Sequence, residues 1–128
     1  MMEQIQFLEI LDVILIHEDQ INLYGGINGI RSFELLESAV NMPKASFDGY
    51  YLHSTIFDKA SAYIYHITQN HPFLDGNKRT ALATGLVFLD LNGIEVEEAD
   101  DELYNMMISV SNGNLKKDEI SELLKSLS

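Results

Sequence analysis

Hydrophobic side chains recur at three- and four-residue steps along most of the chain, which is the pattern of helices with one buried face. Residues 5–20 form the first such segment, and its predicted inner stripe consists of Ile5, Leu8, Leu11 and Leu15. Similar segments occupy residues 33–40, 54–69, 100–110 and 116–127. The pattern therefore predicts an all-α protein.

The segment 77–91 differs from the others because it is apolar on almost every side. A helix of this kind is usually surrounded by other helices, so we expect residues 77–91 to form the centre of the fold. Gly85 has no side chain and should allow a neighbouring helix to approach closely. Asn92 and Gly93 follow as a predicted C-terminal cap.

One stretch, residues 43–53, lacks the helical period. Its Asp48-Gly49 pair lies between aromatic residues, which predicts a short hairpin or loop that projects as a flap. Three aromatic side chains would lie on it, namely Phe47, Tyr50 and Tyr51. They could grip a target protein or tuck into the core, and the pattern leaves both open.

Composition narrows the class of protein. A length of 128 residues predicts one domain, 1–128, and the absence of cysteine excludes disulfides and thiolate metal sites. The net charge of -12 argues against direct binding to DNA or RNA. The sequence shows neither a signal-peptide pattern nor an apolar run long enough to cross a bilayer, so we expect no membrane association and a cytoplasmic location.

Polar and charged side chains are concentrated in residues 71–79, whose sequence is HPFLDGNKR. This stretch lies just where the apolar helix should begin. The first N–H groups of a helix lack internal partners and attract anions. Gly76 and Asn77 suit a tight turn there, and Lys78 and Arg79 add positive charges. Together they predict a seat for phosphate groups.

Two further side chains in this stretch extend the prediction from binding to catalysis. Asp75 is a hard oxygen ligand beside the phosphate seat, as a nucleotide-bound Mg²⁺ requires. His71 carries an imidazole, the kind of side chain whose ordinary pKa of about 6.5 suits a general base near neutral pH. A simple turn between two helices would need only Gly76 and Asn77, so the stretch predicts a Mg²⁺-nucleotide site with a base attached.

Residues 71–79 resemble the signature of the Fic/Doc family, which reads His-any-Phe-any-acid-Gly-Asn-Gly-Arg, two free positions, then Arg. The flanking sequences YGGINGIRSFELLESAV and ALATGLVFLDLNGIEV are similar to those of Doc-type (death-on-curing) toxins. The resemblance covers roughly residues 7–110. It implies a single compact helical domain with the Fic fold and a short hairpin-like flap.

The resemblance also implies a role for each matched residue. His71 corresponds to the general base, Asp75 to the residue that orients Mg²⁺, and Phe73 to a buried aromatic that anchors the loop. The positions that correspond to contacts with the phosphates of ATP are Gly76, Asn77 and Arg79. The segment 44–53 falls where the family has its target-positioning flap.

Two departures from the signature bear on the reaction. Lys78 stands where the usual pattern has Gly, and Leu82 stands where it has the second Arg. Members with the usual pattern transfer AMP to a hydroxyl, whereas Doc-like members share the Asn-Lys-Arg variant and are thought to transfer the γ-phosphate. The resemblance thus favours a kinase that acts on a Thr or Ser of a protein, with AMP transfer and an inactive binding module as the alternatives.

Partners are implied by the same resemblance. In Doc the target is elongation factor Tu, and modification of it stops translation. Many Fic proteins carry their own inhibitory helix with the pattern Ser/Thr, three free positions, Glu, then Gly or Asn, and this sequence has no such string. A separate antitoxin is therefore expected, bound as a short helix in a groove.

Overall fold

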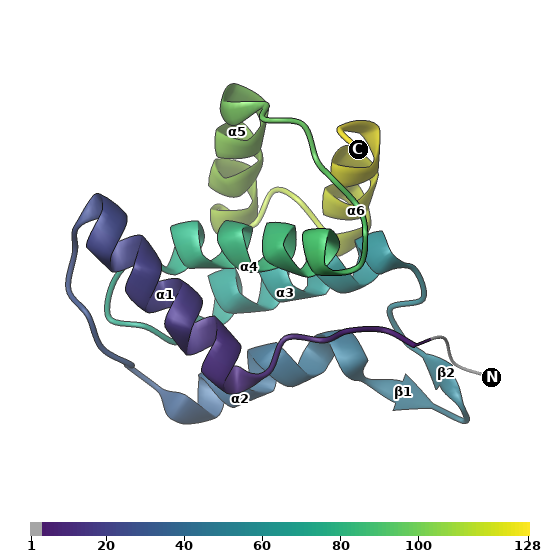
Figure 1. Cartoon of the computed structure of the whole chain (residues 1–128), viewed down its shortest axis with the longest axis horizontal. Coiled ribbons are helices and arrows are strands. Elements are labelled where there is room, and N and C mark those ends of the chain that lie inside the picture. The colour runs from purple at the N-terminus through teal and green to yellow at the C-terminus, as the bar shows by residue number, and fades with distance from the viewer. Residues whose placement is uncertain (1–3) are drawn as a thin grey trace.

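The computed structural model describes residues 4–128, and this part of the chain forms six α-helices, one 3₁₀ turn and one small hairpin (Figure 1). The helices are α1 (Ile10–Tyr24), α2 (Phe33–Asn41), α3 (Ile56–Asn70), α4 (Asn77–Leu91), α5 (Asp100–Ser111) and α6 (Lys117–Ser126). The 3₁₀ turn is η1 (Met42–Lys44), and the strands are β1 (Ser46–Phe47) and β2 (Tyr50–Tyr51). The prediction of an all-α protein with a short flap is confirmed.

The apolar faces of the helices meet in one connected core. Every helix contributes to it, for example through Val13, Leu36, Tyr63, Phe88, Met107 and Leu124. No helix among residues 4–128 has both the length and the apolar character needed to cross a membrane.

The helix at the centre is α3, which packs against α2, α4, α5, α6 and η1. It is buried over most of its length, and even Lys59 is only 1% exposed. By contrast, Val87 and Leu91 on α4 are 42% and 43% exposed. The prediction that residues 77–91 form the centre is therefore wrong, because the outer side of α4 stays at the surface despite its apolar composition.

The first helix begins later than predicted. Residues 4–9 are not helical, and the backbone N–H and C=O of Leu8 both bond to the Tyr63 hydroxyl, at 2.9 and 3.0 Å. The start at Ile10 is set by the Asp12 carboxylate, which accepts the N–H of Glu9 at 2.8 Å. The buried face of α1 is consequently not the predicted stripe.

Leu11 and Leu15 illustrate this change of face, since they are 67% and 55% exposed. The buried residues of α1 are Val13, His17 and Ile21. They recur at four-residue steps, as the inner side of a helix requires.

Close packing between α3 and α4 depends on Gly85, as predicted. A Cβ atom at this position would lie 2.6 Å from both Cγ1 and Cδ1 of Ile64, and 3.4 Å from the Ala60 carbonyl oxygen. Ile64 is fully buried and has no open space into which it can turn. The absence of a side chain at Gly85 therefore sets how close the two helices lie.

The flap forms at the predicted turn. Asp48 and Gly49 both have positive φ angles, 54° and 83°, as tight hairpin turns with a right-handed strand twist require. Ser46 pairs with Tyr51, and Phe47 pairs with Tyr50. The strands are antiparallel and only two residues long.

Of the three aromatic residues of the flap, two are exposed and one packs against the core, so both predicted positions occur. Phe47 and Tyr50 are each 76% exposed. Tyr51 instead packs into the fold, with its ring 5.7 Å from that of Phe7 and the Lys59 Nζ atom 4.2 Å from its centroid. Tyr51 thus attaches the flap to the first turn of α3.

A cluster of basic side chains joins α6 to α3 and to the segment after the flap. The Lys117 Nζ atom lies 3.0 Å from Nε2 of His53 and 3.0 Å from Nε2 of His66. Burial and the neighbouring Lys117 charge lower the pKa of His66 to about 4, and they lower the pKa of His53 as well. Both imidazoles are therefore neutral near pH 7 and can accept hydrogen bonds from the lysine.

We predict that Gly85→Ala destabilises the fold. Overpacking against Ile64 should cost about 1–3 kcal/mol, and the better helix propensity of alanine offsets at most about 1 kcal/mol. Urea denaturation would measure the difference. Val87→Ala, on the exposed side of the same helix, is the control and should shift stability by less than about 0.5 kcal/mol. A Gly85→Ala protein as stable as the parent would contradict the packing argument.

We also predict a loss of stability on mild acidification that depends on His66. In the unfolded chain His66 takes up a proton near its ordinary pKa of 6.5, whereas in the folded chain it does so only near pH 4. The stability contributed by its neutral form is thus complete above about pH 6.5 and declines as the pH falls towards 4.

The measurement compares urea midpoints at pH 7.5 and pH 5.0 for the parent and for His66→Gln, which keeps a hydrogen-bond acceptor but does not titrate. The parent should lose more stability than the variant over this interval. Equal losses would show that His66 is not the group responsible.

Candidate active site

The turn between α3 and α4 carries most of the residues predicted from the signature, and Figure 1 shows it at the same end of the molecule as the loop that follows α1. His71 is the C-cap of α3 and has left-handed backbone angles, φ 47° and ψ 55°. A non-glycine residue adopts this conformation only at a cost, so the surrounding contacts must hold it. The His71 side chain is exposed and accessible to a substrate.

Arg31 supplies two of the contacts that hold His71. Its Nε donates to the carbonyl of His71 at 2.7 Å, and its terminal nitrogen donates to the carbonyl of Asn70 at 2.9 Å. These carbonyls belong to the last turn of α3, where the helix itself offers no donor. The Arg31 side chain thus caps the C-terminal end of α3.

The backbone around Arg31 pairs with the turn as well. The Pro72 carbonyl accepts the N–H groups of Arg31 and Ser32, at 2.7 and 3.0 Å. Ile30 and Phe73 form an antiparallel bridge. The loop after α1 therefore fixes the turn along its length, although the two are about 40 residues apart in sequence.

Inside the turn, Phe73 and Asn77 hold each other. Phe73 is buried, with an exposed fraction of 1%. The Asn77 side chain accepts the Phe73 N–H at 2.9 Å and donates to the Phe73 carbonyl at 3.0 Å. The Asn77 amide also lies 3.4 Å from Nδ1 of His71, which is long for a hydrogen bond. The side chain of Asn77 is thus used to shape the turn, and its backbone N–H remains for a ligand.

Gly76 forms the start of α4. It has φ 74° and ψ 20°, and an added Cβ would lie 3.2 Å from Ile21 Cδ1 and 3.3 Å from an Arg79 nitrogen. Glycine is therefore required here by conformation and by space. The N–H groups of the next residues point out of the first turn of α4, which is the geometry that binds anions at a helix start.

Asp75 lies directly before this helix start. Its carboxylate accepts the Ile27 N–H at 3.1 Å and the Gly76 N–H at 2.8 Å. These hydrogen bonds, with a smaller effect of the Arg79 charge, lower the pKa of the carboxyl group. Asp75 is therefore ionised near neutral pH and keeps further lone pairs for a cation.

Two adjoining cavities share Lys78 and Arg79. One, of about 330 Å³, is lined by His71, Leu74, Asp75, Gly76, Asn77, Lys78 and Arg79. The other, of about 320 Å³, is mostly apolar and is lined by Lys78, Arg79, Leu82, Leu86, Asp100, Leu103, Tyr104, Met107 and Ile108. Arg79 donates to the Gly25 carbonyl at 3.0 Å and lies over the Tyr24 ring. Lys78 and Arg79 thus lie where a polar cavity meets an apolar one. This arrangement suits a ligand with phosphate groups at one end and an apolar organic part at the other.

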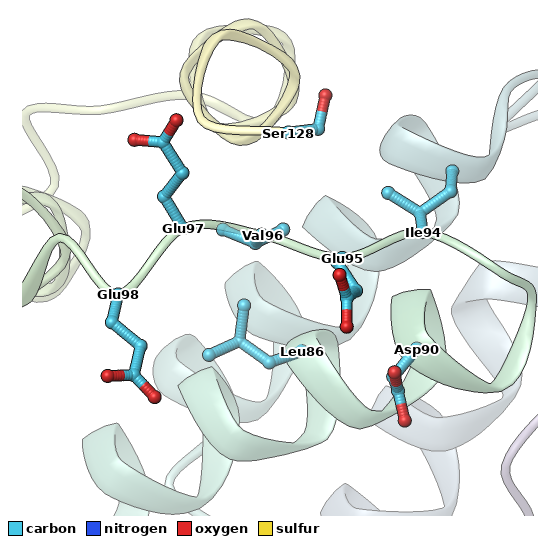
Figure 2. Close-up of a pocket in the computed structure, with 8 residues that line it drawn as sticks. All are labelled: Leu86, Asp90, Ile94, Glu95, Val96, Glu97, Glu98 and Ser128. Carbon is cyan, nitrogen blue, oxygen red and sulfur yellow. The ribbon is translucent and has the colours of Figure 1, made fainter.

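A larger cavity, of about 660 Å³, lies between α4 and the segment that follows it (Figure 2). Figure 2 shows Leu86 projecting from α4 towards the segment that carries Val96, with carboxylate side chains on either side. The acidic residues that line it are Asp90, Glu95, Glu97 and Glu98. Their charge repels phosphate groups, so this cavity is unsuited to the predicted ligand.

The flap does not border the candidate site. Tyr51 contacts Lys59 in the first turn of α3, whereas His71 follows its last turn. Lys59 and His71 are 12 positions apart along α3 and its cap (71 − 59), which is about 18 Å of helix. Figure 1 shows the hairpin and the α3–α4 turn at opposite ends of the molecule. The structure thus joins the residues of the signature but leaves Phe47 and Tyr50 apart from them.

Residues 7–89 match the family model of the Fic/DOC family. The chain belongs to this family. The left-handed His71 and the glycine at the start of α4 are therefore features of a Fic/DOC loop, and the resemblance predicted from residues 71–79 is confirmed at the level of the family.

Two curated relatives are Doc proteins. Toxin Doc of Mycolicibacterium smegmatis is 38% identical over 73 residues, which is 57% of this chain and 56% of that toxin. The match therefore spans little more than half the length of that relative. Protein kinase doc of Escherichia phage P1 is 28% identical over 116 residues, 91% of this chain and 90% of the phage protein. Both confirm the similarity to Doc-type toxins.

The donor set fits a Mg²⁺ ion that arrives with a nucleotide. Across residues 4–128, no three His, Cys, Asp or Glu side chains gather as a metal site, so the protein does not offer a closed cage. Mg²⁺ commonly binds one carboxylate together with water and substrate phosphates. Asp75, beside the phosphate seat, is the residue of the turn that would hold it.

We predict that Asn77→Ala destabilises the protein by about 1–3 kcal/mol, because it leaves the buried N–H and C=O of Phe73 without their partner. Urea denaturation would measure the change. Lys78→Ala, at the adjacent exposed position, is the control and should have little effect on stability. Similar values for the two variants would contradict a structural role for the Asn77 side chain.

Proposed function

We propose that this Fic/DOC protein is a Doc-type toxin that transfers the γ-phosphate of ATP to a Thr or Ser hydroxyl of a target protein. The observation that carries the proposal is the combination, in one turn, of an exposed imidazole, an ionised carboxylate, a free helix start and two cations. The similarity over 91% of the chain to a relative named as a protein kinase supports the same reaction.

Each part of the turn has a task in this reaction. The first turn of α4, with Lys78 and Arg79, binds the phosphates, and the apolar cavity beside them suits the nucleoside. His71 takes the proton of the target hydroxyl. Asp75 would hold Mg²⁺, which supplies charge neutralisation of the phosphates when it is bound.

The bonds exchange in one step. The target oxygen bonds to the γ-phosphorus while the bond from that phosphorus to the β–γ bridging oxygen breaks. The hydroxyl proton passes to His71, and ADP leaves. Most of the rate acceleration in phosphoryl transfer comes from positioning and charge, and both depend on the rigid α3–α4 turn.

The same residues also fit AMP transfer, which is the alternative within the family. Lys78 and Leu82 discriminate between the reactions, because the usual signature has a glycine and a second arginine at these positions. Leu82 lines the apolar cavity and cannot bind a terminal phosphate. This arrangement supports a nucleotide held with its γ-phosphate towards His71.

Elongation factor Tu is the proposed target, and inhibition of translation in the cytoplasm is the proposed consequence. A separate antitoxin is the proposed regulator. These proposals rest on the similarity to Doc toxins, and the antitoxin is supported as well by the absence of an inhibitory-helix string in the sequence.

ATP labelled at the α- or the γ-phosphate tests the reaction. Each would be incubated with Mg²⁺, purified elongation factor Tu or a bacterial lysate, and the protein. Label should transfer from the γ-position alone, and removal of Mg²⁺ with EDTA should abolish it. Label from the α-position would establish AMP transfer instead, and an absence of transfer from both would favour a binding module.

His71→Asn is the informative variant, because asparagine tolerates the left-handed backbone but cannot act as a base. It should lower the transfer rate by about 10²–10⁴-fold, the usual contribution of a general base. His66→Gln serves as the matched histidine control at pH 7.5 and should keep the parent rate. The double variant Lys78→Gly, Leu82→Arg restores the usual signature and should raise the share of label taken from the α-position.

A further inference from the structure

A buried histidine outside the signature contacts the candidate site. His17 lies on the inner face of α1 and is only 2% exposed. Its ring stacks on that of Phe73, with centroids 3.8 Å apart and planes 4° from parallel. The ring therefore lies against the aromatic residue at the centre of the α3–α4 turn, 56 residues away in sequence from Phe73.

The same ring forms a hydrogen bond with the turn. Nε2 of His17 lies 2.8 Å from the carbonyl oxygen of Asp75. A carbonyl oxygen can only accept, so Nε2 carries the proton and donates it. Burial makes this bond costly to lose, because the ring N–H of His17, which is only 2% exposed, has little access to water as an alternative partner.

The bond acts on a single rigid peptide unit. The Asp75 carbonyl and the Gly76 N–H belong to one planar group, so a donor that fixes the first also orients the second. That N–H donates to the Asp75 carboxylate at 2.8 Å. His17 thus orients the peptide whose N–H holds the carboxylate, on the last unit before α4 begins.

We infer that His17 is a positioning residue, which fixes the Asp75–Gly76 peptide so that the carboxylate and the start of α4 face the same ligand. The inference rests on the proposed function for its consequence, namely tighter binding of Mg²⁺ with ATP. Its structural part, the orientation of the peptide, can be measured without any ligand.

A histidine that merely fills space in the core would show the same burial and the same stacking. The hydrogen bond distinguishes the two roles, and two substitutions separate it from packing. His17→Phe keeps an aromatic ring against Phe73 but has no donor. His17→Gln keeps an N–H donor at about the same reach but loses the stacked ring.

The first measurement is amide hydrogen exchange of Gly76 in the free protein, followed by ¹⁵N NMR. Exchange should be faster in His17→Phe than in the parent, and His17→Gln should restore the parent rate even where its thermal midpoint is lower. Parent-like exchange in His17→Phe, or exchange that follows thermal stability in both variants, would overturn the inference.

The second measurement is binding of Mg²⁺-ATP by calorimetry, together with the Mg²⁺ concentration that half-saturates label transfer. Residues that orient a metal ligand typically contribute 10–100-fold to affinity. His17→Phe should therefore weaken Mg²⁺-dependent binding by about 10–100-fold, and His17→Gln should remain within a few-fold of the parent. Unchanged affinity in His17→Phe would contradict the inference.

The two proposals fail in different ways. If the parent binds Mg²⁺-ATP but transfers no label, the proposed reaction is wrong, and the exchange and binding data still test His17. If label transfer occurs while Gly76 exchange and Mg²⁺-dependent binding are the same in His17→Phe as in the parent, His17 is a core residue, and the proposed reaction stands.

Discussion

The candidate site depends on hydrogen bonds that reach the α3–α4 turn from other elements. The turn has little regular structure of its own, and one of its residues, His71, has a left-handed backbone that is unfavourable by itself. Arg31 holds the turn from the loop after α1, and Asn77 holds it from within α4. The exposed imidazole is thus supported by hydrogen bonds from the loop after α1 and from the first residue of α4.

The central position of α3 explains how these contacts are kept in place. It packs against four other helices, so its C-terminal end, from which His71 projects, is a rigid base for the turn. Gly85 allows α4 to lie close beside α3, and the short turn of residues 71–76 keeps the start of α4 next to the end of α3. The site therefore rests on two helices that are joined by a short turn and packed closely against each other.

Much of this arrangement could be predicted from the sequence, for reasons that are local. The signature predicts the polar turn because its residues are neighbours in the chain, and Asp48-Gly49 predicts the hairpin because a two-residue turn demands those backbone angles. Gly85 predicts a close helix contact because a glycine inside an apolar helix has few other uses.

The missed features depend on contacts between distant segments. The buried face of α1 follows from Leu8 being bonded to Tyr63, which is 55 residues away, and no periodicity in residues 5–20 reveals that contact. His17 and Arg31 look like ordinary surface or core residues until the fold brings them to the turn. The signal available in the sequence is that His17 lies four residues from both Val13 and Ile21, which makes it the polar member of an otherwise apolar helix face.

The separation between the flap and His71 limits what kind of substrate can touch both. The rise of α3 from Lys59, which contacts the flap, to His71 is about 18 Å, which an extended peptide covers with about five or six residues. A tripeptide around the modified hydroxyl cannot reach the exposed aromatic rings of Phe47 and Tyr50 at the same time. A target that engages both ends must present either a longer extended segment or a folded surface of matching width, so groups well away from the modified hydroxyl would contribute to recognition.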